Sequence, residues 1–280
     1  MKMNRTLYIT DLDGTLLNNR GKVTATSAEI ISDLSHRGAL ISVATARTPA
    51  TVEKLLENTY TAAELVVMTG ASLWDRPGHR FVDMHLIPEA DVLAMLEVFG
   101  EGEVNPFCYT LRGDNHLDVY HASTVLSPAE TLFVDQRRNL TLKTFHLAQS
   151  CPVDSCSRVV LFFGMGPKDA IITVAEKLWR VTGCYVSFYK DTYTPNLWLL
   201  EVFAPGVSKA AGIARLKERV GANRVVAFGD NLNDIPMLRS ADVAVAVENA
   251  LPEVKAIADV VIGPNTDDSV ARFIQQDFMQ

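Results

Sequence analysis

The sequence lacks the features that mark several classes of protein, and each absence restricts what the chain can do. Its 26 Lys and Arg residues are outnumbered by 33 Asp and Glu residues, so an extended basic surface for nucleic acid is not expected. No apolar run approaches the roughly 20 residues that cross a bilayer. The first residues, Met1 to Tyr8, also lack the apolar stretch of a secretory signal. We therefore expect a cytoplasmic protein without nucleic-acid or membrane partners.

Cysteine and glycine patterns exclude further classes. The four cysteines include no CxxC pair and no dense spacing, so free thiols are expected, although Cys151 and Cys156 could pair or bind a metal. No GxGxxG run follows the first expected strand, which disfavours a dinucleotide-dependent oxidoreductase.

The two ends of the chain share one pattern. With 280 residues, of which 48% are hydrophobic, the chain is long enough for one large domain that carries an insert. Both ends alternate short β-rich runs with helical periodicity, which is typical of a parallel sheet covered by helices. Strands are expected at residues 7–9, 40–44, 65–68, 225–228 and 243–247, and helices at residues 26–37, after 48, 208–220 and near 236–238. We assign residues 1–80 and 190–280 to a Rossmann-like α/β core.

The middle of the chain, residues 81–189, has a different pattern. Its strand candidates alternate apolar and polar residues, as at residues 117–121, which indicates antiparallel strands with one face in water. Helical periodicity recurs near residues 90–99 and 170–180. The segment is therefore predicted to be an inserted α+β domain.

A pair of carboxylates follows the first strand. Asp11 and Asp13 stand in the run Asp-Leu-Asp-Gly-Thr, at the carboxyl end of a parallel strand, where open α/β sheets bind their ligands. Their spacing places them on one face while the strand continues, and Gly14 then lets the backbone turn away. One carboxylate can then attack as a nucleophile while the other moves a proton.

A second pair, Asp230 and Asp234, lies in the run Gly-Asp-Asn-Leu-Asn-Asp after a later strand. Asp230 is expected at the strand tip and Asp234 about one helical turn away, close enough for both to face one hard cation. A phosphate among four carboxylates meets like charges, each close pair costing on the order of 4 kcal/mol at about 4 Å and an effective dielectric constant of about 20. A divalent cation must offset this repulsion, and oxygen ligands favour Mg²⁺.

Two further residues are notable for their positions. Lys209 opens a predicted helix, where the helix dipole disfavours a cation, and such a broken local rule is typical of functional sites. Thr45 ends the second strand, where its hydroxyl can donate to a phosphate oxygen.

Together these runs resemble the four motifs of the haloacid dehalogenase superfamily of phosphatases. The resemblance implies that Asp11 forms an aspartyl-phosphate and that Asp13 protonates the leaving oxygen, activates water and gives its backbone carbonyl to the metal. It also implies Asp11 and Asp230 as magnesium ligands, and Asp234 as a ligand or as the partner of one. Thr45, Arg47, Lys209 and Asn233 are implied as phosphate contacts.

The position of the insert resembles the type II cap of the Cof-like subgroup, which acts on sugar phosphates and related metabolites. Three positions depart from the subgroup's usual residues, with Ala46 for a glycine, Thr69 for an asparagine and Glu248 for a glycine. The resulting prediction is a Mg²⁺-dependent phosphatase for a small phosphorylated metabolite, with a sugar phosphate as the expected substrate. A phosphomutase and a non-catalytic phosphometabolite-binding protein are the alternatives.

Overall fold

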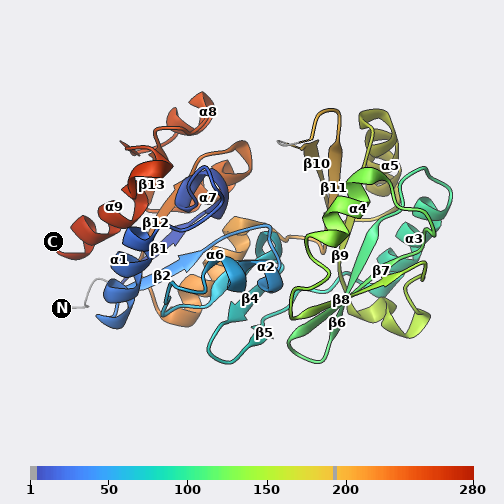
Figure 1. The fold of residues 1–280 in the computed structure, drawn as a ribbon, viewed down its shortest axis with the longest axis horizontal. Helices are drawn as coiled ribbons and strands as arrows, with labels where there is room; N and C mark the ends of the chain where they lie inside the picture. Colours follow the sequence, from blue (N-terminus) through green and yellow to red (C-terminus); the bar gives the residue numbers. More distant parts are fainter. Residues whose placement is uncertain (1–4, 192–193) are drawn as a thin grey trace. The chain divides into compact units, whose positions relative to one another are not determined.

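The computed structural model describes residues 5–191 and 194–280, and these form two compact units (Figure 1). One unit comprises residues up to 82 together with residues 208–280, and the other comprises residues 83–207. No helix among the described residues is long and apolar enough to cross a membrane.

The first unit is built on a five-stranded parallel sheet in the order β14-β13-β12-β1-β2. Its strands are β1 (Thr6–Thr10), β2 (Leu40–Val43), β12 (Arg224–Gly229), β13 (Val243–Val247) and β14 (Val260–Ile262). The strands β1 and β12 are almost wholly buried apolar runs, as expected for a sheet covered on both faces. The central strand β1 pairs with β2 on one side and β12 on the other, so the two ends of the chain share one sheet.

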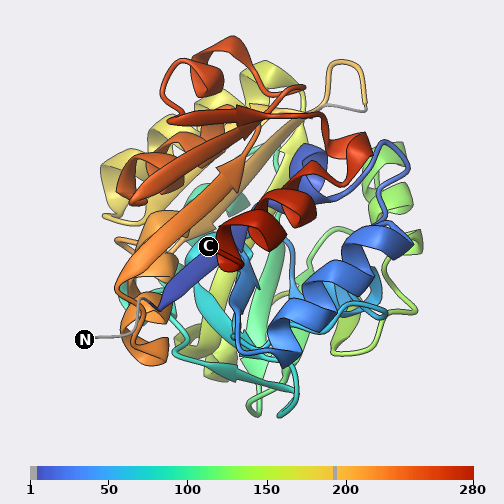
Figure 2. The ribbon, with the colours of Figure 1, turned by 90° about the vertical axis from the view of Figure 1, so that its left-hand side faces the viewer.

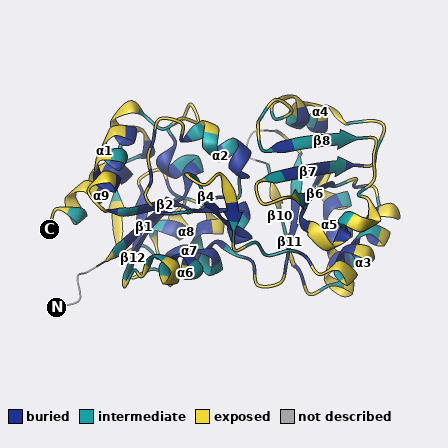
Figure 3. Ribbon diagram, turned by 90° about the horizontal axis from the view of Figure 1, so that it is seen from below, coloured by how far each residue is buried: buried dark blue, intermediate teal, exposed yellow. Residues whose placement is uncertain are grey.

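Helices and a small antiparallel sheet complete this unit. The helices are α1 (Ala25–His36), α2 (Pro49–Leu55), α6 (Lys209–Val220), α7 (Ile235–Ser240), α8 (Pro252–Lys255) and α9 (Ser269–Phe278). The small sheet contains β3 (Leu65–Val67), β4 (Ser72–Asp75) and β5 (Arg80–Val82). Helices α1 and α9 pack side by side, with their outward faces exposed (Figures 2 and 3).

The second unit is a six-stranded sheet in the order β10-β11-β9-β6-β7-β8. Its strands are β6 (Phe107–Arg112), β7 (His116–His121), β8 (Lys143–Leu147), β9 (Val159–Gly166), β10 (Tyr185–Lys190) and β11 (Trp198–Phe203), and its helices are α3 (Glu89–Gly100), α4 (Pro128–Asp135) and α5 (Lys168–Val181). Phe99 of α3 meets Phe162, whereas Phe133 of α4 meets Phe163. Because neighbouring residues of a strand point to opposite faces, helices cover both faces of this sheet.

The predicted fold class, a parallel α/β core with an inserted α+β domain, is confirmed. Two details differ. Strand β11 pairs with β9 and β10 of the second unit, so that unit extends to residue 207, beyond the expected boundary at 189. The expectation of a wet face at residues 117–121 was wrong, because Leu117, Asp118 and Val119 are all buried.

Candidate active site

The first two aspartates of the motifs meet because their strands are neighbours. Asp11 directly follows β1, and Asp230 directly follows β12. These strands pair in parallel with Thr10 opposite Phe228, and the Asp11 amide donates to the Phe228 carbonyl at 3.0 Å. The carboxyl ends of adjacent parallel strands lie at one edge of the sheet, so both side chains reach the same place.

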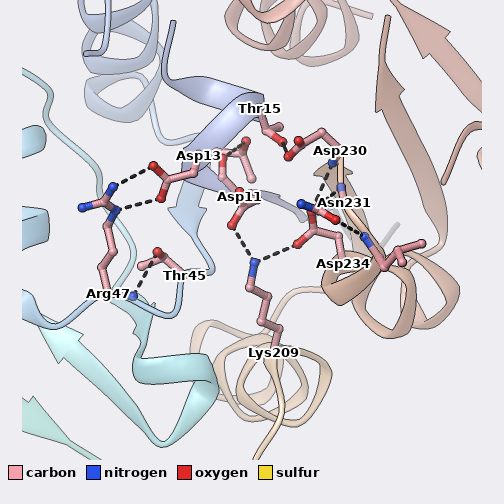
Figure 4. Close-up of polar contacts among 11 residues, drawn as sticks. Asp11, Asp13, Thr15, Thr45, Arg47, Lys209, Asp230, Asn231 and Asp234 are labelled. Atoms are coloured by element: carbon pink, nitrogen blue, oxygen red, sulfur yellow. Dashed lines mark hydrogen bonds and ion pairs between the residues drawn. The ribbon is translucent and has the colours of Figure 1, made fainter. Parts of the chain in front are cut away.

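Lys209 ties together Asp11 and Asp234 (Figure 4). Its Nζ donates to Oδ1 of Asp11 at 2.5 Å and to Oδ1 of Asp234 at 2.7 Å. The helix that carries it, α6, begins there because Ser208 caps it, with the Ser208 hydroxyl accepting from the Ala211 amide at 3.1 Å. The unfavourable position of Lys209 at a helix start is therefore offset by two ion pairs.

The three side chains of this bridge are buried. Asp11 is 7% exposed, Lys209 4% and Asp234 0%. Burial raises the pKa of Asp11 to about 7, the charges of Asp234 and Asp230 add to the rise, and the Lys209 ammonium opposes it. Burial lowers the pKa of Lys209, but the two carboxylates outweigh it and hold the ammonium charged.

Asp230 completes the cluster from the other side. Its Oδ1 accepts from the Thr15 hydroxyl at 2.8 Å. Burial raises the pKa of Asp230 to about 6, against the effect of this hydrogen bond. Carboxylate oxygens of Asp11, Asp230 and Asp234 all lie within 4.8 Å of one another.

This cluster fits a hard divalent cation. Three carboxylates against one ammonium leave excess negative charge in a buried place. Burial is the main cause of the raised pKa of Asp11 and Asp230, and the charges of the neighbouring carboxylates add to it. A cation between the carboxylates would favour their charged forms. The donor set consists of oxygen atoms, which suits Mg²⁺ or a similar ion.

Asp13 points away from the cluster. Its Oδ2 and Oδ1 accept from Nε and Nη2 of Arg47, each at 2.7 Å, which forms a bidentate ion pair (Figure 4). The carboxylate of Asp13 is not part of the three-aspartate group. The Thr45 hydroxyl accepts from the Arg47 amide at 3.2 Å and lies on the same side.

Close backbone approaches fix the positions of these groups. Gly14 has φ 80°, and a Cβ there would collide with the Asp230 carboxylate. A Cβ on Gly212 of α6 would lie 2.5 Å from Cγ1 of Val66 and 2.9 Å from Cα of Gly70. Helix α6 therefore packs almost directly on the backbone after β3, which fixes the base of the Lys209 side chain.

The motifs did not predict the roles of two polar residues near the site. The Thr15 hydroxyl donates to the Asp230 carboxylate, although Thr15 stands in the first motif. The Nδ2 of Asn249 donates to the Gly14 carbonyl at 2.7 Å and so fixes the turn after Asp13. Asn233 is exposed in the turn Leu232–Asp234. In the same turn, Oδ2 of Asp234 accepts from the backbone N–H groups of Asp230 and Asn231, each at 3.1 Å.

Comparison with known proteins agrees with this site. A family model described as haloacid dehalogenase-like hydrolase matches residues 8–274. This chain belongs to that family of hydrolases. Within the family, it is 26% identical over 273 residues to a 5-amino-6-(5-phospho-D-ribitylamino)uracil phosphatase of Bacillus subtilis (strain 168), covering 96% of this chain and 94% of the relative. It is 26% identical over 271 residues to a pyridoxal phosphate phosphatase of Escherichia coli (strain K12), covering 94% and 95%.

Solved structures of the haloacid dehalogenase-like family share the fold. A haloacid dehalogenase-like hydrolase from Bacteroides thetaiotaomicron has a TM-score of 0.78 at 22% identity, covering 97% of this chain and 99% of its own. A subclass IIB sugar phosphatase has a TM-score of 0.71 at 21% identity, covering 98% and 100%. The expected family and enzyme class, a phosphoric monoester hydrolase, are thereby confirmed.

Proposed function

We propose that this chain is a Mg²⁺-dependent phosphatase that hydrolyses a small phosphorylated metabolite through an aspartyl-phosphate on Asp11. The observation that carries the proposal is the buried bridge in which Lys209 holds both Asp11 and Asp234. An ammonium at 2.5 Å fixes one oxygen of Asp11 and leaves the other for attack. The same positive charge would attract the phosphate and stabilise the charge that builds up on it.

The reaction would proceed in two displacements. In the first, an oxygen of Asp11 forms a bond to phosphorus while the bond to the leaving oxygen breaks, and Asp13 delivers a proton to that oxygen. In the second, Asp13 takes a proton from water, the water oxygen bonds to phosphorus, and the bond to Asp11 breaks. Inorganic phosphate leaves and Asp11 returns to its starting form.

The Arg47 contact adds a step for Asp13. Both carboxylate oxygens of Asp13 accept hydrogen bonds from the Arg47 guanidinium. For the first displacement, Asp13 would leave Arg47 and take up a proton from solvent, which it then delivers to the leaving oxygen. The Arg47 guanidinium would then contact the phosphate, which is the role that its motif position suggests.

The carboxylates of Asp11, Asp230 and Asp234, with the backbone carbonyl of Asp13, would hold Mg²⁺. A bound Mg²⁺ would neutralise the carboxylates and the phosphate, and polarise the phosphoryl oxygens. Thr45 would donate its hydroxyl to the phosphate. Asn233, which is exposed on the turn beside Asp234, would contact the phosphate.

The names of the relatives support the substrate class. The two relatives described above are named for phosphate esters of small metabolites, one of which carries a ribityl chain. We propose a small phosphorylated metabolite for this chain, with sugar phosphates as the first class to test. A screen of phosphorylated sugars, nucleotides and cofactors for phosphate release would identify the ester.

The inserted unit would choose among such esters, because Asp11, Asp13, Lys209, Asp230 and Asp234 all lie outside it. Lys143 is 5% exposed and lines a cavity of about 410 Å³ together with Val134, Arg138, Thr144, Phe145 and Leu147. Substitutions in this unit should reorder preference among esters and spare a small, undemanding one.

Two experiments test the chemistry. Asp11→Asn should abolish turnover and leave the circular-dichroism spectrum unchanged, because an amide is not a nucleophile here. Asp33→Asn, at an exposed carboxylate of α1, is the matched control and should retain full turnover. Chelation should stop phosphate release, and Mg²⁺ should restore it better than Ca²⁺, whose looser coordination misplaces the reacting oxygen. Substantial turnover by the Asp11→Asn variant would refute the assignment of Asp11 as the nucleophile.

The same assays separate the alternatives. A phosphomutase would convert a sugar phosphate into its isomer and release little free phosphate. A non-catalytic binding protein would bind the ester without either product. Release of free phosphate at a rate that depends on Asp11 excludes both.

A further inference from the structure

Three consecutive residues that follow β3 have a left-handed backbone. Met68, Thr69 and Gly70 have φ angles of 49°, 56° and 89°, and they form the turn Met68–Gly70, which we name the left-handed turn. Glycine adopts this conformation readily, whereas in other residues the Cβ atom comes too close to the following carbonyl oxygen. Met68 and Thr69 carry side chains, and Thr69 is β-branched, so both are strained here. Such strain persists only where the surrounding contacts hold it.

The left-handed turn holds the segment that follows β2. The Thr69 N–H donates to the Thr45 carbonyl at 2.9 Å, and the Met68 N–H donates to the Arg47 carbonyl at 3.0 Å. Thr45 and Arg47 are the residues of this segment that are proposed above to contact the phosphate. Because both N–H groups belong to strained residues, the positions of Thr45 and Arg47 depend on the left-handed conformation of the turn.

The same turn holds helix α6. A Cβ on Gly70 would collide with the carbonyl oxygen of Ser208, so the two backbones are in direct contact. Ser208 caps α6 immediately before Lys209. Further along α6, Nη2 of Arg215 donates to the Gly70 carbonyl at 2.5 Å. The helix is therefore attached to the turn at two points, and the second is a hydrogen bond from a charged group, which is stronger than one between neutral groups.

The left-handed turn thus joins two parts of the active site that are distant along the chain. Arg47 pairs with Asp13 in one of them. Lys209 pairs with Asp11 and Asp234 in the other. A phosphate bound between them needs both cations at fixed positions, and a displacement of about 1 Å can cost roughly 100-fold in rate. A contact that sets the distance between Lys209 and Arg47 therefore affects catalysis without touching the substrate.

We propose that Arg215 is a positioning residue for the phosphatase reaction and that it acts through the left-handed turn. The Arg215 guanidinium holds the Gly70 carbonyl, and the turn holds the backbone of the segment after β2. The ammonium of Lys209 is carried by the same helix as Arg215. This role rests on the function proposed above, since the phosphate is taken to bind between Lys209 and Arg47. It requires no contact between Arg215 and the substrate.

Loss of the guanidinium would let the strain relax. Without the hydrogen bond to Gly70, Met68 and Thr69 can shift towards negative φ, where residues with side chains are more stable. Their N–H groups would then turn away from the carbonyls that they hold after β2. The phosphate contacts of that segment would move relative to Lys209, while the rest of the fold remains.

Arg215→Met in the full chain removes the guanidinium and keeps an unbranched side chain. Arg219→Met is the matched control, because Arg219 lies one turn further along α6 and pairs with Glu64 at 3.1 Å in a partly exposed ion pair. Kinetics with p-nitrophenyl phosphate and saturating Mg²⁺ are measured where circular dichroism shows each variant folded. Arg215→Met should lower kcat about 10- to 100-fold and change KM less than about threefold, because the ester still binds but is misaligned. Arg219→Met should keep kcat within about twofold.

Relief of the strain should rescue the variant. Asparagine adopts a left-handed φ more readily than threonine, so Thr69→Asn keeps the turn in place with less need of the guanidinium. Thr69→Asn alone should raise the melting temperature by about 2–4 °C. Added to Arg215→Met, it should restore kcat at least about fivefold. A purely structural role of Arg215 predicts no such recovery, and the recovery assigns the loss to the turn rather than to another contact of Arg215.

Hydrogen exchange measures the link without any substrate. The amide hydrogens of Met68 and Thr69 are bonded in the native protein, so the peptide that contains them should exchange slowly. Arg215→Met should accelerate this exchange at least about tenfold, whereas Arg219→Met should not. If the exchange differs in this way but the native protein releases no phosphate, the proposed function and the positioning role both fail, and the link between Arg215 and the turn stands.

Three results would overturn the positioning role. A folded Arg215→Met variant with native kcat would show that the hydrogen bond to Gly70 does not affect catalysis. Unchanged exchange at Met68 and Thr69 would show that the guanidinium does not hold the turn. No recovery of kcat in the double variant would place the effect of Arg215 outside the turn.

Discussion

Removal of the Lys209 ammonium tests the central claim about the site. Lys209→Met keeps an unbranched side chain of similar length and deletes the charge that pairs with Asp11 and Asp234. The two carboxylates, 7% and 0% exposed, would then face each other without a cation. Breaking a buried ion pair in this way costs about 3–5 kcal/mol. In metal-free buffer at pH 8 we expect a loss of this size in the free energy of unfolding.

The loss should depend on pH in a defined direction. In the native protein the pKa of Asp11 is about 7, above its ordinary value of 3.8, although Lys209 lowers it. In the variant this pKa must lie higher still, so the folded chain keeps a proton that the unfolded chain releases. The free energy of unfolding therefore falls as pH rises from the ordinary pKa of Asp11, 3.8, to its pKa in the folded chain. In the variant this fall continues beyond pH 7. The difference between variant and native protein should be larger at pH 8 than at pH 5.

Urea unfolding followed by circular dichroism, with a chelator present, measures both values. Lys217→Met is the matched control, because Lys217 lies in the same helix and pairs with Asp242 at 3.4 Å on the surface. The Lys217→Met variant should lose less than about 1 kcal/mol in the free energy of unfolding at either pH. Equal losses for the two variants, or a larger loss for Lys209→Met at pH 5 than at pH 8, would refute the electrostatic account.

Three other substitutions test neighbouring contacts. Thr15→Val removes the 2.8 Å hydrogen bond to the Asp230 carboxylate. The Mg²⁺ concentration for half-maximal activity should rise roughly fivefold, which corresponds to about 1 kcal/mol. An unchanged Mg²⁺ titration would contradict this role of Thr15. Arg47→Met should lower kcat/KM about 10- to 100-fold, as measured by steady-state kinetics. The free energy of unfolding in urea should change by less than about 1 kcal/mol, because the ion pair of Arg47 with Asp13 is partly exposed. Gly212→Ala should destabilise by about 1–3 kcal/mol in thermal unfolding, whereas Gly100→Ala, where a Cβ meets open space, should be neutral or stabilising.

Much of the core and site was accessible from the sequence because local rules and tertiary structure agree there. Asp11 and Asp230 each follow a short buried run, and the rule that parallel strands end at one edge was enough to place them together. Strand Val243–Val247 and helix α6 also lie within a residue of their expected bounds. The periodicities in these segments are strong and uninterrupted.

The remaining features depend on tertiary contacts that leave no local pattern. Strand β11 is an apolar run that would suit either unit, and only its pairing with β9 and β10 decides between them. The spacing of Asp11 and Asp13 indicated a shared pocket, but the backbone turn at Gly14 and the guanidinium of Arg47 direct Asp13 elsewhere. A side chain's partner across 34 residues cannot be read from spacing.

The shared central sheet also has a consequence for biosynthesis. Strand β1 is made before β12 and can pair with β2, but its other edge stays open until β12 has been made. Between them comes the whole second unit, residues 83–207, which has its own core and can fold during synthesis. An unpaired, apolar edge strand is a template for aggregation, so the nascent chain is most at risk while this unit is being translated. The cluster around Asp11 cannot assemble until Asp234 has been added, so the active site forms only after the whole second unit has been made.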